Sequence, residues 1–233
     1  MAISFLHKNS FLRLKSIILA VACCCLSIMT ALSLSSCHTA TDYFSYVSEL
    51  RDNVFIGEND ILRLRAYALE KESPYLTDGI PCEKNTKAEI YVSAPSSEKV
   101  CEISFTVNNE NIRGEMSYDN VKGEYFFAYP ISISTLTSIV FTISYGDETF
   151  SITANSVKTA QTLSPQAILQ SVVNSEKELF SNMTDKYGFT GEIYMRFIYE
   201  DAPFYYVGII QRNGNVTAFL LNANTGKILA KRQ

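Results

Sequence analysis

In Ile61-Leu62-Arg63-Leu64-Arg65-Ala66-Tyr67, apolar and charged side chains alternate with a period of two from Leu62 onward. Successive side chains of a strand point to opposite faces, so this pattern predicts a β-strand with one buried face. The same period appears at residues 88–92 and 103–107. We therefore expect a protein built mainly of β-sheet around this stretch.

The strand pattern continues through the middle of the chain without a helical pattern between the strands. Roughly seven short strands in about 100 residues favour an immunoglobulin-like β-sandwich, which we place at residues 54–157. The Cys-Trp-Cys signature of immunoglobulin domains is absent, because the chain has no tryptophan, and the strand topology stays open. The further strands are expected at residues 112–118, 124–129, 138–145 and 149–154, with turns at Asp78-Gly79, Asn108-Asn109, Lys122-Gly123 and Gly146-Asp147.

After a short linker, residues 164–233 are expected to form a small domain in which a helix packs on an antiparallel sheet. Ser164-Pro165 is a typical helix start, with serine as N-cap and proline at the first helical position. An apolar stripe, broken by Glu176, runs from there to Met183 and predicts one helix. The fold class is thus α+β, mostly β. Strands are expected at residues 192–199, 204–210, 216–222 and 228–229.

This tail resembles the PepSY module. The matching residues are Tyr205-Tyr206-Val207-Gly208-Ile209-Ile210 with Asn213-Gly214, and then Leu221-Asn222-Ala223-Asn224-Thr225-Gly226-Lys227-Ile228-Leu229. The chain departs from the family at Asn222, where Asp is usual, and in a helix without an alanine-rich start. The resemblance implies that the protein modulates an extracytoplasmic peptidase.

The N-terminus resembles the signal peptide of a bacterial lipoprotein. A basic segment precedes an apolar run that ends in Leu34-Ser35-Ser36-Cys37, which is similar to a lipobox. The resemblance implies a signal peptide at residues 1–36, a lipid on Cys37 and a place on the outer face of the cell membrane. The alternative is an uncleaved transmembrane anchor. Residues 37–53 then form a tether, with a short helix predicted from helical spacing at residues 41–53.

Charge and composition exclude some classes of binding partner for the mature chain. After Cys37, 17 basic and 24 acidic residues remain, a net charge of −7. This charge argues against nucleic acid as a partner and against electrostatic binding to anionic lipid, so the lipid on Cys37 must provide the anchor. Apart from that lipid, no cofactor and no metal is expected, because the only histidine after Cys37 is His38 on the tether.

Two groups of residues stand out as candidate sites. Cys82 and Cys101 either form a disulfide or are two free, buried thiols, and the spacing leaves both open. An aromatic group near the C-terminus is a candidate recognition surface, although part of it is expected to belong to the core. Its members are Tyr194, Tyr199, Tyr205 and Tyr206.

We therefore expect a non-catalytic binding or accessory module that acts on an envelope protein partner. A hydrolase that uses two facing carboxylates is the rival hypothesis, although no acidic pair stands out by its spacing. A purely structural envelope protein is the third. The oligomeric state stays open.

Overall fold

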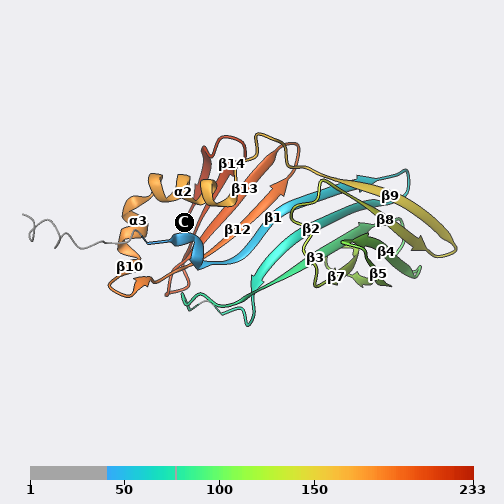
Figure 1. Ribbon diagram of the computed structural model, residues 1–233, viewed down its shortest axis with the longest axis horizontal. Helices are drawn as coiled ribbons and strands as arrows, with labels where there is room; N and C mark the ends of the chain where they lie inside the picture. The colour runs from blue at the N-terminus through green and yellow to red at the C-terminus, as the bar shows by residue number, and fades with distance from the viewer. Residues whose placement is uncertain (1–40, 77) are drawn as a thin grey trace, which may run out of the picture. The chain divides into compact units, whose positions relative to one another are not determined.

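Within residues 41–76 and 78–233, which the computed structural model describes, nine antiparallel strands form a nearly closed barrel (Figure 1). The predicted signal peptide and Cys37 lie outside these residues. Around the barrel the strands are β1 (Val47–Glu58), β2 (Arg63–Glu72), β3 (Lys84–Ser93), β7 (Glu124–Tyr129), β6 (Ser117–Asp119), β5 (Glu110–Glu115), β4 (Cys101–Val107), β8 (Ser138–Tyr145) and β9 (Glu148–Ser156).

Met116 connects β5 and β6, the two edge strands that meet where the barrel closes. It is the only residue between β5, which pairs with β4, and β6, which pairs with β7. Its side chain is buried, and its amide donates a hydrogen bond of 2.8 Å to the carbonyl of Cys101. The chain therefore passes from the strand that pairs with β4 to the strand that pairs with β7 at a single buried residue.

The predicted immunoglobulin-like sandwich is wrong. In a sandwich the two sheets are separate, whereas here β9 pairs with β1 at Phe55 and Ile56, and β5 leads directly into β6. Both connections join the halves that the sandwich would keep apart. Alternation predicts which segments are strands, but it does not predict which strands pair, because pairing depends on bends such as the one at Met116.

The interior of the barrel is filled by apolar side chains from alternate positions of its strands. They include Phe55 on β1, Phe105 on β4 and Phe141 on β8. The rings of Phe105 and Phe141 are 5.0 Å apart at their centroids. The sequence stretch at residues 61–67 contributes Leu64 and Ala66 to this core, as its alternation predicts.

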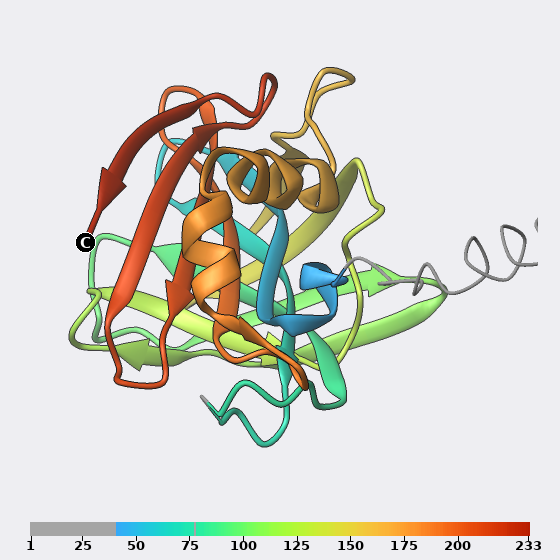
Figure 2. The ribbon, with the colours of Figure 1, turned by 90° about the vertical axis from the view of Figure 1, so that its left-hand side faces the viewer.

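The first half of β1 starts a second part of the sheet, because it pairs in parallel with β12 (Glu192–Tyr199). Helices α2 (Pro165–Ser175) and α3 (Lys177–Asn182) cover one face of this part (Figure 2). A separate core lies beneath them, centred on Leu169, Phe197 and Phe219. The remaining elements are β13 (Pro203–Ile210), β14 (Val216–Asn222), β15 (Ile228–Arg232) and the hairpin β10 (Thr184–Asp185) and β11 (Gly188–Phe189).

The helix start predicted at Ser164 is confirmed. The Ser164 hydroxyl accepts a hydrogen bond of 3.2 Å from the Ala167 amide, and Pro165 occupies the first turn. The apolar stripe does not continue as one helix, however. The chain leaves helical geometry at Glu176, with φ −117° and ψ 40°, and α3 begins at the next residue.

The helix predicted at residues 41–53 is wrong. The structure has one 3-10 turn, η1 (Tyr43–Tyr46), and then the twelve residues of β1. This strand is buried on both faces near its start, where Val47, Ser48, Glu49 and Leu50 are all buried. Strands that lie inside a sheet lose strict alternation, so their apolar positions can imitate helical spacing.

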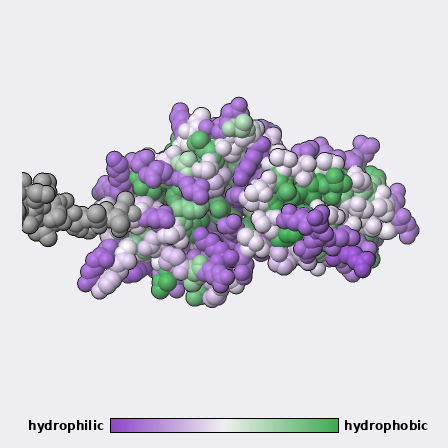
Figure 3. All heavy atoms as spheres, in the orientation of Figure 1, coloured by the Kyte–Doolittle hydropathy of each residue, from purple (hydrophilic) through white to green (hydrophobic). Residues whose placement is uncertain are grey.

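Residues 41–233 thus hold two cores that share β1 within one compact unit. The boundary expected at residue 54 falls inside β1, which contributes Phe55 to the barrel core and Leu50 to the core under the helices. Polar side chains are spread over the face seen in Figure 3, with smaller hydrophobic groups between them. Among the described helices, none is long and apolar enough to cross a membrane.

Candidate functional site

The sheet face that α2 and α3 leave uncovered carries a row of aromatic and charged side chains, most of them buried or half-buried. On β12, alternate residues such as Met195 contribute to the core under the helices, whereas Tyr194 and Arg196 point the other way. The strand pairing places Glu49 beside Tyr194, and Arg51 beside Arg196. We call this surface the open face. Its residues are Glu49, Arg51, Arg65, Tyr67, Lys71, Tyr91, Lys122, Glu124, Tyr194, Arg196 and Tyr206.

Tyr194 and Tyr206 form one end of the open face. Their ring centroids lie 5.9 Å apart, on the neighbouring strands β12 and β13. Tyr194 lies across Gly208, because a Cβ atom at Gly208 would be 2.0 Å from the Tyr194 Cζ atom. Burial raises the pKa of Tyr194 to about 12, and the neighbouring Tyr206 hydroxyl adds to that rise. Tyr194 is therefore a neutral hydrogen-bonding group at physiological pH.

An ion-pair network occupies the middle of the open face. The buried Glu49 carboxylate accepts a hydrogen bond of 2.6 Å from Arg196 Nε and lies 3.2 Å from Lys71 Nζ. Burial alone would raise the pKa of Glu49, but the hydrogen bonds and positive charges of Arg196 and Lys71 outweigh it and lower the pKa. Glu49 thus holds two basic side chains in place beside the tyrosines.

The other end of the open face is hollowed between β1, β2, β3 and β7. This pocket has a volume of about 250 Å³. The Cζ atom of Arg51 lies 4.1 Å from the centroid of the Tyr67 ring. Lys122 Nζ donates a hydrogen bond of 3.0 Å to the Tyr91 hydroxyl and lies 4.2 Å from the centroid of that ring. The pocket therefore places Arg51 and Lys122 against two aromatic walls, Tyr67 and Tyr91.

Glu124 is the carboxylate of this pocket. Arg65 Nη2 donates to both of its oxygens at 2.7 Å, and the Ser93 hydroxyl donates to Oε1 at 2.5 Å. Burial lowers the pKa of Arg65, but the interactions with Tyr67 and Glu124 outweigh that effect and leave the pKa raised. Glu124 is consequently engaged by Arg65 and Ser93.

The structure divides the four tyrosines of the predicted recognition surface. Tyr194 and Tyr206 come together on the open face, whereas Tyr205 is fully buried in the core under the helices. Tyr199 is exposed at the end of β12, beside a hollow that Asp201 also lines. Alternation along β12 and β13 is the signal that separates Tyr205 from Tyr194 and Tyr206.

Cys82 and Cys101 are free thiols in different surroundings. Cys101 is buried in the barrel core, with Sγ 3.6 Å from the Met116 sulfur, and burial raises the pKa of its thiol to about 11. Cys82 lies on the segment before β3, where its amide donates a 3.0 Å hydrogen bond to the buried Glu72 carboxylate. A thiol whose pKa is raised by burial is a poor nucleophile.

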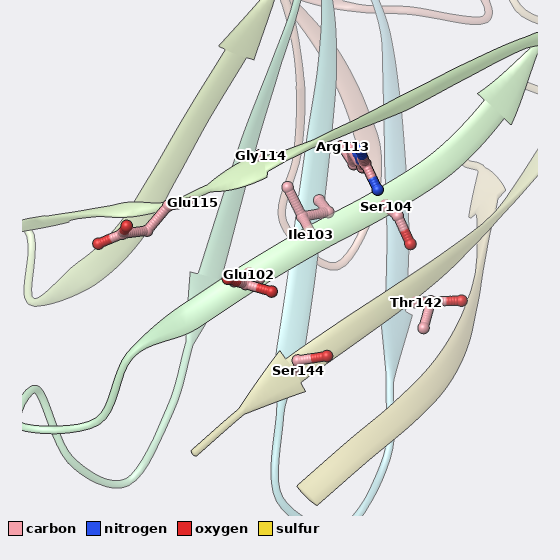
Figure 4. A pocket seen from close by; sticks show the side chains of 8 residues that line it. All are labelled: Glu102, Ile103, Ser104, Arg113, Gly114, Glu115, Thr142 and Ser144. Carbon is pink, nitrogen blue, oxygen red and sulfur yellow. The ribbon is translucent and has the colours of Figure 1, made fainter. Parts of the chain in front are cut away.

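A further hollow, of about 420 Å³, lies on the outer surface of the barrel over β4, β5 and β8 (Figure 4). It contains Glu102 and Glu115, which are directly opposite each other on paired strands. Both side chains are exposed, so neither has the apolar surroundings that turn a carboxyl group into a general acid at neutral pH. In the described part of the chain, no group of three or more His, Cys, Asp or Glu side chains could hold a metal ion.

No protein-family model, curated protein or solved structure matches this chain. Its function therefore has to be inferred from the residues of the open face and from the N-terminal sequence.

Proposed function

We propose that this protein is a lipid-anchored, extracytoplasmic binding module that contacts an envelope protein partner through its open face. The observation that carries the proposal is the open face itself, where Tyr194, Tyr206 and Arg51 are half-buried on the sheet surface that α2 and α3 leave uncovered. Tyrosine and arginine supply much of the energy of protein interfaces, because both offer a flat apolar surface together with hydrogen-bond donors. The predicted lipid on Cys37 supplies the location.

The open face is also ordered before any partner binds. Arg196 is held by Glu49, and Arg51 and Lys122 lie against the rings of Tyr67 and Tyr91. Side chains that are already fixed lose less conformational entropy when they bind a partner. This ordering supports a recognition surface, whereas a solvated face would leave long side chains free to move.

The PepSY-like tail supports a peptidase as the class of partner within this proposal. Asn222 stands where the family usually has Asp, but its Oδ1 atom accepts hydrogen bonds of 3.0 Å from the amides of Asn224 and Thr225. Such a turn needs an acceptor oxygen and no charge, so asparagine serves as well as aspartate. The departure at Asn222 therefore does not weaken the resemblance.

The anchor is tested by replacing Cys37. In cells grown with labelled palmitate, Cys37→Ala is expected to remove the label from the protein, because no thiol would remain at the predicted lipidation position. Cys24→Ala is the matched control, since Cys24 lies within the predicted signal peptide, and this variant should keep the label. Labelled Cys37→Ala would contradict the lipid anchor.

The binding surface is tested by photo-crosslinking the full-length chain in its own cells. A photoreactive phenylalanine analogue at Tyr206 is expected to give a discrete crosslinked protein band, and the same analogue at Thr142, on the outer surface of the barrel, is not. Adding Gly208→Val should abolish the band at Tyr206, because the new side chain would displace the Tyr194 ring. Equal crosslinking at both positions, or none at Tyr206, would refute the proposal.

A further inference from the structure

The pocket at the far end of the open face carries an excess of positive charge. Arg51, Arg65 and Lys122 line it, against the single carboxylate of Glu124. Arg65 already engages both oxygens of that carboxylate. Among the ion pairs of residues 41–76 and 78–233, none involves Arg51 or Lys122. Two cations of the pocket are therefore available to a ligand.

Arg51 has an unmet hydrogen-bonding requirement. Its Nε atom is buried and has no hydrogen-bond partner in the described part of the chain. The Tyr67 ring packs against the flat surface of the Arg51 guanidinium group. The ring does not accept the hydrogen bonds that the N–H groups along the edge of the guanidinium group can donate. Burial also lowers the pKa of Arg51, and the negative charges of Glu89 and Glu49 do not fully offset that effect. An anion at this position would remove the cost of burying that donor.

We infer that this pocket binds one compact oxyanion, either a carboxylate or a phosphate group of the partner, between Arg51 and Lys122. The inference rests on the proposed function, in which the open face is the binding surface. A planar guanidinium group pairs with carboxylate or phosphate through two parallel hydrogen bonds, and an ammonium group adds a point charge. The volume of about 250 Å³ suits a single such group together with a few water molecules.

Two further carboxylates near the pocket are already engaged. Glu89, which faces Arg51 and Lys122, forms an ion pair of 2.6 Å with Lys87. Asp119 accepts hydrogen bonds from the amides of Val121 and Lys122 in the turn before β7. They moderate the positive charge of the pocket, so we expect weak binding of a free anion and stronger binding when the anion belongs to a larger partner.

The inference is tested by titrating the full-length chain, purified in detergent, with sodium acetate and with methyl phosphate at constant ionic strength. Isothermal calorimetry is expected to show saturable binding with a dissociation constant of about 1–10 mM for at least one of them. Tighter binding of acetate would identify a carboxylate, as on a peptide or an acidic sugar. Tighter binding of methyl phosphate would identify a phosphorylated polymer or headgroup. Heats no different from those of chloride for both probes would overturn the inference.

Two variants with opposite expected effects on anion affinity distinguish a binding site from general damage to the fold. Arg51→Gln should weaken anion binding about tenfold, because it removes a charge and its paired donors. Glu124→Gln should instead strengthen binding about threefold, because it frees Arg65 for the anion. Arg113→Gln, on the outer surface over β5, should leave binding unchanged. Unaltered affinity in Arg51→Gln, or weaker binding in Glu124→Gln, would overturn the inference.

The crosslinking experiment and the anion titration can fail independently of each other. If neither anion binds but crosslinking at Tyr206 persists, the anion pocket is wrong and the proposed binding surface stands. If an anion binds as expected but Tyr206 gives no crosslink, the pocket stands and the proposed protein partner is wrong.

Discussion

Phe141→Ala is expected to lower the free energy of unfolding by about 3–5 kcal/mol. Phe141 lies at the centre of β8, is fully buried, and packs against the ring of Phe105 at a centroid distance of 5.0 Å. Truncating it removes a large apolar group from water-free surroundings and leaves a cavity that strands on all sides cannot fill. Urea unfolding followed by circular dichroism would measure the loss.

Val140→Ala is the matched control on the same strand. Its side chain is 55% exposed, so the change should stay within about 0.5 kcal/mol. A loss for Phe141→Ala as small as that of Val140→Ala would contradict the barrel interior as described.

The same variant tests whether the two cores unfold together. Because β1 pairs with β2 and β9 in the barrel and with β12 beside the helices, unfolding of the barrel should expose β12 as well. Hydrogen exchange in Phe141→Ala is therefore expected to rise in β12–β14 along with β8. Unchanged protection of β12–β14 would instead show two independently unfolding parts, in agreement with the domain boundary predicted from the sequence.

Local patterns in the sequence predicted individual elements well. The bounds expected at residues 124–129, 138–145, 192–199 and 216–222 coincide with β7, β8, β12 and β14. Each of these strands is rich in aromatic or β-branched residues and has turn residues close to its ends, so the information lies within a few neighbours. The helix start at Ser164 also depends only on neighbouring residues.

The pairing of distant strands could not be predicted from these patterns. β1 and β12 pair in parallel although about 145 residues separate Val47 from Ile193, and no local signal connects them. The closure of the barrel depends on Met116, a single buried residue between two strands that the pattern presents as one. Non-local pairing of this kind is decided by the packing of the whole sheet.

The candidate site was predicted only in part for the same reason. Alternation along β12 and β13 indicates that Tyr194 and Tyr206 share a face, and the structure brings their rings together. The sequence did not indicate Arg51 as a site residue, because Arg51 lies in the segment predicted as a helix. Its position beside Tyr67 depends on the antiparallel pairing of β1 with β2, and the Tyr91 wall depends on β3.

Glu49→Gln is expected to lower the free energy of unfolding by roughly 1–3 kcal/mol at pH 7. Glu49 is buried and pairs with Arg196 and Lys71, so removing its charge leaves two basic groups without their partner. The loss should stay below that of a fully buried pair, because Arg196 and Lys71 are 41% and 34% exposed. Urea unfolding at pH 7 would measure it.

Glu192→Gln should have the opposite sign. Glu192 is 4% exposed, and its carboxylate oxygens have no hydrogen-bond partner among the described residues. Burial raises the pKa of Glu192. The nearby Ser48 hydroxyl and Gly79 amide oppose the rise only in part, and the negative charges of Glu72 and Asp78 add to it. Since the ionised form is disfavoured in the folded protein, a neutral glutamine should raise the free energy of unfolding at pH 7.

The pH dependence of the two variants separates these effects. The pKa of Glu49 is lowered on folding, so its stabilising contribution is present above the ordinary value of 4.5 and is lost as the pH falls through the lower folded value. The pKa of Glu192 is raised, so its cost is present at neutral pH and disappears as the pH falls through the raised value toward 4.5. The difference between wild type and Glu192→Gln should therefore vanish on mild acidification, whereas the difference between wild type and Glu49→Gln should persist until the pH falls below 4.5. If both differences vanished over the same pH range, the two carboxylates would share one environment, and the contrast between a paired and an unpaired buried charge would be wrong.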